Sequence, residues 1–476
     1  MNTIYAKLNN NIILNSKGQI YYKSSLDANL DFFAATSRND TSKKIKECFA
    51  DAYIEDKKLA LANLLYALDI RSGKGERRIF KKSFITLCNH DKESALKVLK
   101  YIPTLGRYDY ILKGLHSLIE DEVVDLIDKQ LKLDIVSDNP SLLAKWLPSL
   151  KTHDRVNEVA KYLIKKLNIS EKEYRKTLST LRSKINIVEK NLTNKDYFNI
   201  DYNNVPSKAM LKYQDAFLRN DNQKYNKYLL DLKKGDGKVN TKGLFSYEII
   251  KKVNKLQYGE KNELLDEMWK NQKDVLNGLS SNVLVMADTS GSMTYLSDIP
   301  ISTSIGLAIY IAQRNTGIFK DCFITFASKP KLVKLKGESI TEIVRNIRCI
   351  NDNTNIDAAF KMLLNKMVSE KVNKKDEPSH IVIISDMEFD CGVYSKNSTN
   401  FEGWKKAFKE KGYSLPKIIF WNVACKSGGL AATKMDNDVI MVSGFSTNIL
   451  ENIFNLDNYN PKEYMLEVLE KYLKML

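Results

Sequence analysis

The pattern of apolar and polar positions changes its period along this chain of 476 residues. From about Thr41 onward, apolar residues recur at helical spacing through most of the first half. One such helix face carries four leucines at the i, i+3, i+4 and i+7 positions: Leu61, Leu64, Leu65 and Leu68. From residue 281 onward, short apolar runs alternate with helical patterns. These runs predict five strands: Val283–Ala287, Cys322–Ala327, His380–Ser385, Lys417–Val423 and Asp438–Val442.

Alternating strands and helices are typical of a mostly parallel sheet with helices on both faces. The helical patterns between and after the strands are Ser302–Gln313, Thr341–Ile347, Ile356–Val368, Phe401–Glu410, Asn448–Phe454 and Glu463–Leu476. We therefore predict an α + α/β protein. Its expected parts are a helical domain over residues 1–250, a connecting helix over 251–280 and a Rossmann-like α/β domain over 281–476. Residues 1–25 could also form short strands.

The net charge of +16 is distributed unevenly between these parts. Residues 281–476 hold 24 basic and 22 acidic residues, which leaves 50 basic and 36 acidic residues in 1–280, a net charge of +14. Positive charge concentrated in one domain favours a polyanionic partner, most often a nucleic acid. The alternative is that these lysines are only solvated surface residues, and that their number reflects the base composition of the genome.

Several classes of protein are not favoured by the sequence. No apolar run reaches the roughly 20 residues of a membrane span, and the first residues lack the apolar region of a signal peptide. We therefore expect a cytoplasmic protein without a membrane partner. The six cysteines include no CxxC pair and the four histidines are far apart, so neither zinc binding nor cysteine or histidine chemistry is favoured.

Oxygen-bearing side chains follow two of the predicted strands. Asp288, Ser290 and Ser292 come directly after the first strand, and Asp386 comes directly after the third. Thr354 stands in the loop before a predicted helix. Ligands of open α/β sheets bind at the carboxyl ends of strands, and Mg²⁺ or Ca²⁺ prefers oxygen ligands. The five residues are therefore predicted to converge on one cation, unless they serve as capping and turn residues without a metal.

This combination resembles a von Willebrand factor A domain with its metal-ion-dependent adhesion site. The resemblance covers roughly residues 281–476 and matches every motif position. It implies that Ser290, Ser292 and Thr354 contact the cation, and that Asp288 and Asp386 act directly or through water. It further implies Mg²⁺, or another divalent cation such as Ca²⁺ or Mn²⁺, with one coordination position open to an acidic protein ligand.

The whole layout resembles the TROVE proteins, the Ro autoantigen and its bacterial relatives, and more closely an uncharacterised family of the same layout. The closer resemblance is carried by Asp69–Arg77, Gly106–Asp109, Val205–Met210 and Ile384–Asp390. It implies HEAT-like helical pairs in a ring that the A domain closes. It also implies that the partner is RNA, either structured or single-stranded.

Basic residues of the first 250 positions are the candidates for contact with RNA phosphates. They lie in the turn Arg71–Arg77 and the helix after it, in the motif Gly106–Asp109, and on two helices after residue 170. The candidates are Lys74, Arg77, Arg78, Arg107, Arg175, Lys176, Arg182, Lys184, Lys208, Lys212 and Arg219. Tyr108, Tyr174 and Tyr213 are candidates for stacking on bases. The alternative is that the basic residues form solvated helix faces and that the tyrosines belong to the core.

The preferred hypothesis is a non-enzymatic, Ro-like RNA-binding protein with a cation in its A domain. The alternative is a metal-dependent protein-interaction scaffold that does not bind RNA. A nuclease is disfavoured because a single site rich in hydroxyl ligands differs from the paired, carboxylate-bridged metals of phosphodiester hydrolysis. Glu388 and Asp390 do not complete a general base, nucleophile and oxyanion arrangement. The turn Arg71–Arg77 lacks the spacing of a phosphate loop.

Overall fold

The computed structural model describes residues 10–14, 20–150, 154–185, 187–276, 282–294, 297–325, 329–347, 355–389, 400–424, 429–451, 453–456 and 459–476. The chain forms two compact units. The first, called the sheet unit here, comprises residues 1–63, 72–74 and 241–475, and the second, the helical unit, comprises 64–71, 75–240 and Leu476. No helix in the described ranges is long and apolar enough to cross a membrane.

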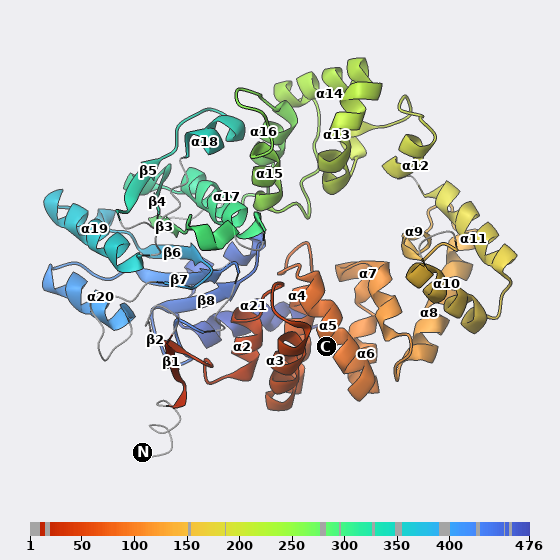
Figure 1. Cartoon of the computed structure of the whole chain (residues 1–476), viewed down its shortest axis with the longest axis horizontal. Coiled ribbons are helices and arrows are strands. Elements are labelled where there is room, and N and C mark those ends of the chain that lie inside the picture. The colour runs from red at the N-terminus through yellow and green to blue at the C-terminus, as the bar shows by residue number, and fades with distance from the viewer. Residues whose placement is uncertain are drawn as a thin grey trace. The chain divides into compact units, whose positions relative to one another are not determined.

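A six-stranded sheet forms the centre of the sheet unit, in the order β5-β4-β3-β6-β7-β8 (Figure 1). All neighbouring strands are parallel except β4 and β5, which are antiparallel. The strands are β3 (Val283–Ala287), β4 (Cys322–Thr325), β5 (Lys331–Lys334), β6 (His380–Ser385), β7 (Lys417–Asn422) and β8 (Val439–Ser443). The predicted α + α/β class is therefore confirmed.

All five predicted strands are present. β3 and β6 have the predicted bounds, β7 ends one residue earlier than predicted, and β8 begins and ends one residue later. The last two residues of the predicted second strand, 326–327, lie outside the described ranges. β5 was not predicted because it is lysine-rich and mostly exposed, as is common for a strand at the edge of a sheet.

Both faces of the central strands are covered. Every residue of β3, β4, β6 and β8 is buried, and successive side chains of a strand point to opposite faces. Helix α17 (Ile299–Arg314) packs against β3 and β4, and α15 (Ser246–Val253) packs against α17. A Cβ at Gly306 would lie 3.2 Å from Ile250 Cγ1, so the glycine allows the two helices to approach closely.

The N-terminal residues also belong to the sheet unit. Helices α2 (Ala28–Ala34) and α21 (Pro461–Leu473) pack against β8, and the rings of Phe33 and Tyr464 lie 5.9 Å apart. Residues 1–63 and 241–280 thus group with the sheet, whereas we predicted boundaries at 250 and 281. The physical reason is that β8 and α17 require cover, which chain segments distant in sequence provide.

The remaining elements of the sheet unit are two short strands and several helices. Short strands suggested within residues 1–25 are present as the antiparallel pair β1 (Ile12–Leu14) and β2 (Ile20–Tyr22), and residues 1–9 lie outside the described ranges. The other helices are α3 (Ser42–Glu55), α16 (Glu263–Lys270), α18 (Ile340–Asn346), α19 (Ile356–Ser369) and α20 (Asn400–Glu410). The connecting helix is shorter than expected, because α16 ends at Lys270. The segment predicted as Asn448–Phe454 forms two 3₁₀ turns, Thr447–Leu450 and Ile453–Asn455.

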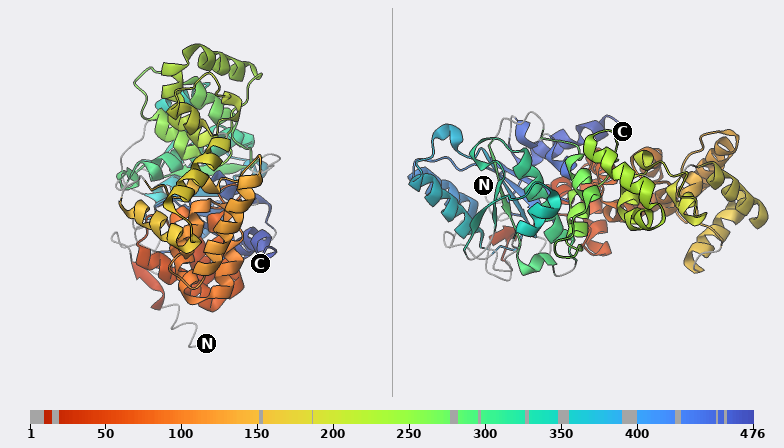
Figure 2. Two further views of the ribbon diagram at one scale, coloured as in Figure 1. Left: turned by 90° about the vertical axis from the view of Figure 1, so that its right-hand side faces the viewer. Right: turned by 90° about the horizontal axis from the view of Figure 1, so that it is seen from above.

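Helices account for all regular structure in the described part of the helical unit, as Figures 1 and 2 show. Its α-helices are α5 (Arg77–His90), α6 (Lys92–Leu99), α7 (Ile102–Leu105), α8 (Glu120–Val136), α9 (Leu143–Trp146), α10 (Asp154–Leu167), α11 (Glu171–Lys184), α12 (Val188–Thr193), α13 (Ser207–Asn220) and α14 (Asn222–Lys234). Two 3₁₀ turns, Tyr108–Gly114 and Tyr202–Asn204, join some of them. Helix α4 (Lys57–Leu68) runs across the boundary between the units.

Candidate functional site

Two buried carboxylates lie at the edge of the sheet where the strand order reverses direction. The chain proceeds outward from β3 through β4 to β5, and then returns to β6 on the other side of β3. Asp288 directly follows β3 and Asp386 directly follows β6, and both side chains are 0% exposed. This reversal is the point at which open α/β sheets bind ligands at the carboxyl ends of their strands.

Hydrogen bonds hold the acidic and hydroxyl groups of this site. Asp288 Oδ1 accepts from the Ser290 amide at 2.9 Å, and Asp288 Oδ2 accepts from the Ser385 hydroxyl at 2.6 Å. The Ser290 and Ser292 Oγ atoms lie 2.9 Å apart. Asp386 Oδ1 accepts from the amide of Glu388 at 3.1 Å. The turn after β3 and the loop after β6 thus bring four of the five predicted metal ligands to one edge.

Burying the ionised carboxylates of this site costs free energy. Burial, and after it the negative charge of Asp386, raise the pKa of Asp288 to about 6, although hydrogen bonds from Ser385 and Ser290 lower it. Two adjacent carboxylates in a buried position favour either a bound cation or a proton. The donor set of carboxylates and hydroxyls fits a hard divalent cation.

The fifth predicted ligand, Thr354, lies outside the described residues, as does Asp390. Helix α19 begins just after this position, and the Asn355 side chain caps it by accepting from the Ala358 amide at 2.9 Å. Among the described residues, no group of three or more His, Cys, Asp or Glu residues is arranged to hold a metal ion. The candidate site consists of two carboxylates and hydroxyl groups, so it is a different kind of donor set.

One residue near the site was missed by sequence reasoning. Tyr21, which is 1% exposed, donates its hydroxyl to the carbonyl of Met387 at 2.5 Å and accepts from the amide of Phe389 at 3.1 Å. Met387 has a φ of +65°, a left-handed conformation that is uncommon for a residue other than glycine. The Tyr21 hydroxyl therefore holds the loop that directly follows Asp386.

A close backbone contact positions Tyr21. The amide and carbonyl of Tyr22 pair with those of Leu430 at 3.0 and 2.8 Å. A Cβ at Gly429 would lie 2.8 Å from Tyr21 Cβ, so this position requires glycine. The pairing joins residues about four hundred positions apart, and no periodic pattern in the sequence indicates it.

The predicted RNA contact at Lys74 is not supported by its position. Lys74 is 3% exposed, and its ammonium donates to the carbonyls of Phe33 and Thr36 at 2.9 and 3.1 Å and to the Ser443 hydroxyl at 2.7 Å. The glycine-rich turn directs this lysine into the sheet unit, where its ammonium is used inside the fold. It is therefore not available to an RNA phosphate at the surface.

Two further RNA candidates help to hold the helical unit together. Arg182 donates to the carbonyls of Ala144 and Leu147, each at 2.8 Å, and to the Ser149 hydroxyl at 2.7 Å. Lys184, although exposed, donates to the carbonyls of Ile135 and Ser137 at the end of α8, at 2.9 and 3.1 Å. Among the stacking candidates, Tyr174 is buried and belongs to the core, whereas Tyr108 and Tyr213 are partly exposed.

Apart from Lys74, the basic candidates are exposed or half-buried in the helical unit. The exposed ones are Arg77, Arg175, Lys176, Lys184, Lys212 and Arg219. The half-buried ones are Arg78, Arg107, Arg182 and Lys208. Arg175 forms an ion pair with Glu171 at 2.8 Å. The structure does not gather these residues into one predicted site, because they are distributed over several helices.

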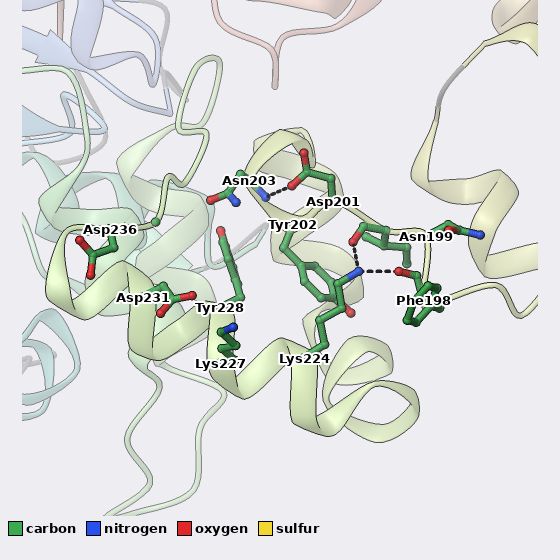
Figure 3. A pocket seen from close by; sticks show the side chains of 12 residues that line it. Phe198, Asn199, Asp201, Tyr202, Asn203, Lys224, Lys227, Tyr228, Asp231 and Asp236 are labelled. Carbon is green, nitrogen blue, oxygen red and sulfur yellow. Dashed lines mark hydrogen bonds between the residues drawn. The ribbon is translucent and has the colours of Figure 1, made fainter.

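A cleft of about 520 Å³ lies between the segment Phe198–Asn203 and helix α14 (Figure 3). Lys224 projects from α14 and donates to the carbonyls of Phe198 and Ile200, both at 2.6 Å. The charged lining residues are Lys224, Lys227, Asp201, Asp231 and Asp236. Because acidic side chains outnumber basic ones, this cleft is a poor site for phosphate groups.

Comparison with known proteins divides the chain at the start of β3. Residues 16–105 and 113–284 match the Domain of unknown function (DUF2828), and residues 282–472 match the Domain of unknown function (DUF7788). The chain is also 29% identical over 512 residues to "Uncharacterized protein L728" of Acanthamoeba polyphaga mimivirus, across 97% of this chain and 88% of that protein. Because the match to DUF2828 spans more than half of the chain, the protein belongs to the DUF2828 family.

Proposed function

We propose that the protein binds RNA through its helical unit and performs no catalysis. The observation that carries the proposal is the charge of this unit. Residues 64–71 and 75–240 hold 33 basic and 23 acidic residues, so they contribute +10 to the total net charge of +16. Basic side chains that neutralise phosphates release condensed counterions, which gives affinity with little dependence on base sequence.

The proposal assigns a divalent cation to the sheet unit, with Mg²⁺ preferred and Ca²⁺ or Mn²⁺ as alternatives. Asp288, Ser290, Ser292 and Asp386 would hold it, and Thr354 stays a predicted ligand. The paired buried carboxylates support this assignment, because a cation would offset their mutual repulsion. The bound cation would stabilise the two loops and present an open position to an acidic ligand, as the resemblance to an adhesion-type site implies.

RNA binding is tested on the full chain, purified with and without nuclease. We expect RNA to co-purify without nuclease, and the nuclease-treated protein to bind a labelled single-stranded RNA in fluorescence anisotropy. The logarithm of the binding constant should fall linearly with the logarithm of the salt concentration, by about 0.7 for each phosphate contact. Absence of co-purifying RNA together with absence of salt-dependent binding would overturn the proposal.

A second candidate function is a metal-dependent scaffold that captures an acidic protein. The site around Asp288 favours it, because an adhesion-type cation binds a carboxylate of its ligand. Asp288→Ala distinguishes the candidates. Under the scaffold function it should abolish cation-dependent partner capture, whereas under the RNA function it should leave most RNA affinity intact.

Asp51→Ala is the matched control for this experiment, since Asp51 is an exposed aspartate on α3 of the same unit. It removes the same charge without touching the candidate cation site. If Asp51→Ala lowered partner capture as strongly as Asp288→Ala, the effect would reflect net charge and the metal-dependent function would be rejected.

A further inference from the structure

In the helical unit the cations of Lys81 and Arg107 lie beside aromatic rings, and Arg77 and Lys113 are electrostatic neighbours of Lys81. Helix α5 supplies Arg77 and Lys81, and the 3₁₀ turn Tyr108–Gly114 supplies Tyr110 and Lys113. Trp146, which is half-buried, ends helix α9. We call this set, completed by Arg107, the Tyr110 cluster. Its six members are Arg77, Lys81, Arg107, Tyr110, Lys113 and Trp146.

The two rings fix the centre of the cluster. The Lys81 ammonium lies 4.9 Å from the centre of the Tyr110 ring, and the Arg107 guanidinium lies 5.3 Å from the same point. The guanidinium also lies 4.0 Å from the centre of the Trp146 ring. Asp109 accepts from Arg107 Nε at 2.8 Å, so the arginine is held in place by an ion pair as well as by both rings.

The cluster carries an excess of positive charge. Asp109 pairs with Arg107, whereas no carboxylate of the described residues lies within 4.0 Å of the charged groups of Arg77, Lys81 or Lys113. Partial burial lowers the pKa of Lys81, and Arg107, Lys113 and Arg77 lower it further, against an opposing effect of Asp109. A bound anion would therefore relieve repulsion among cations that the fold holds close together.

We propose that the Tyr110 cluster binds the phosphodiester backbone of single-stranded RNA, with a base against Trp146. Unpaired cations beside an aromatic ring are the arrangement by which proteins hold single strands, because every base has a face that can stack. Bases in a duplex are stacked on one another and would not reach the indole. This proposal rests on the proposed RNA-binding function, and it adds Lys81, Lys113 and Trp146 to the predicted contacts.

Each member of the cluster has a distinct role in this site. The flexible ammonium groups of Lys81 and Lys113 donate to phosphate oxygens. Arg107 stays paired with Asp109 and acts as a fixed charge beside the rings. Trp146 is half-buried, with the Arg107 guanidinium 4.0 Å and the Lys145 ammonium 5.8 Å from its ring centre, and its remaining exposed surface favours an unpaired base over an acidic side chain.

The experiment measures binding of a labelled twelve-nucleotide oligouridylate to the full chain by fluorescence anisotropy. Lys81→Gln combined with Lys113→Gln keeps the alkyl stems and removes two charges. The control is Lys234→Gln combined with Lys238→Gln, two exposed lysines at the end of α14 and just after it. We expect the cluster variant to bind at least about tenfold more weakly, with a salt slope smaller by about 1.4, and the control to stay within about twofold of the unmodified protein.

A third variant, Trp146→Leu, separates stacking from charge. It should weaken binding of the oligonucleotide while leaving the salt slope unchanged, because no phosphate contact is lost. Thermal unfolding of each variant checks that the helical unit remains folded. A poly-glutamate of similar length is the competitor that represents an acidic protein.

The outcomes distinguish this proposal from the function on which it rests. If the unmodified protein binds the oligonucleotide and the cluster variant matches the control, the cluster assignment is wrong and RNA binding stands. If the unmodified protein does not bind at any salt concentration, both are wrong. Stronger retention of poly-glutamate than of oligouridylate by the cluster would assign it to acidic proteins and overturn the proposal.

Discussion

The hydroxyl of Tyr21 bridges two backbone groups in the loop after Asp386, and its removal leaves both without that partner. We predict that Tyr21→Phe weakens binding of Mn²⁺ to the full chain several-fold, because the loop loses the contact that holds its left-handed residue. The change should also lower the free energy of unfolding by roughly 1 to 3 kcal/mol. Cation affinity is measured by calorimetry, and stability by urea unfolding.

A matched control separates positioning from general destabilisation. Tyr413 donates its hydroxyl to the carbonyl of Met367 at 2.8 Å, in the same unit but on different elements. Tyr413→Phe should lower stability and leave Mn²⁺ affinity unchanged. Equal losses of affinity in the two variants would show that Tyr21 has no specific role at the cation site.

His380 makes the stability of the sheet unit depend on pH. It is 5% exposed, and its ring lies 5.1 Å from that of Phe454. Burial, with a smaller effect of Lys417, lowers the pKa of His380 from 6.5 to about 4. Unfolding therefore takes up a proton at His380 between these values, and the contribution of His380 to stability should fall as the pH drops from about 6.5 towards 4, by on the order of 3 kcal/mol.

Urea unfolding across this pH range tests the assignment. His380→Phe should remove this part of the pH dependence, because the variant has no group to protonate there. His90→Phe changes an exposed histidine and should keep the full dependence. An unchanged pH profile in the His380 variant would contradict the role given to this residue.

At the scale of elements, Lys74 joins three segments that are far apart in sequence. Its ammonium connects the end of α2, the turn at residues 72–74 and the end of β8. Lys74→Met should lower the free energy of unfolding by roughly 2 to 4 kcal/mol, because three buried oxygens lose a charged donor, while the hydrogen bonds of the Ser443 hydroxyl remain. RNA affinity of the folded variant should stay unchanged, and a selective loss of that affinity would restore Lys74 as an RNA contact.

The strands of the sheet were predictable because each parallel strand is buried on both faces and appears as a continuous apolar run. β5 escaped prediction because an edge strand with exposed lysines has no such run. The carboxylates Asp288 and Asp386 were predictable for a related reason, since they follow two of those runs directly. Tyr21 was not, because its function depends on a pairing with residues 429 and 430 that no local pattern encodes.

At the scale of the whole molecule, the sheet unit depends on segments before residue 281. Helix α15 covers α17, and α2 covers β8. We predict that a fragment of residues 281–476 is poorly soluble and lacks a cooperative unfolding transition, because these apolar surfaces become exposed. Calorimetry and binding of a hydrophobic dye compare it with the full chain, and cooperative unfolding of the fragment would contradict the assignment of units.

The order of segments in the sheet unit also affects how the chain folds while the ribosome synthesises it. Helix α2 is made early, but its neighbours β8 and α21 are among the last residues to emerge. At about 5 to 20 residues per second, roughly 20 to 80 seconds separate them. Until β8 and α21 are made, the buried face of α2, including Phe33, lacks the elements that cover it, whereas the whole of 75–240 has already been made. The helical unit can therefore fold before the sheet unit is complete, because α2 cannot pack in place until β8 and α21 have been synthesised.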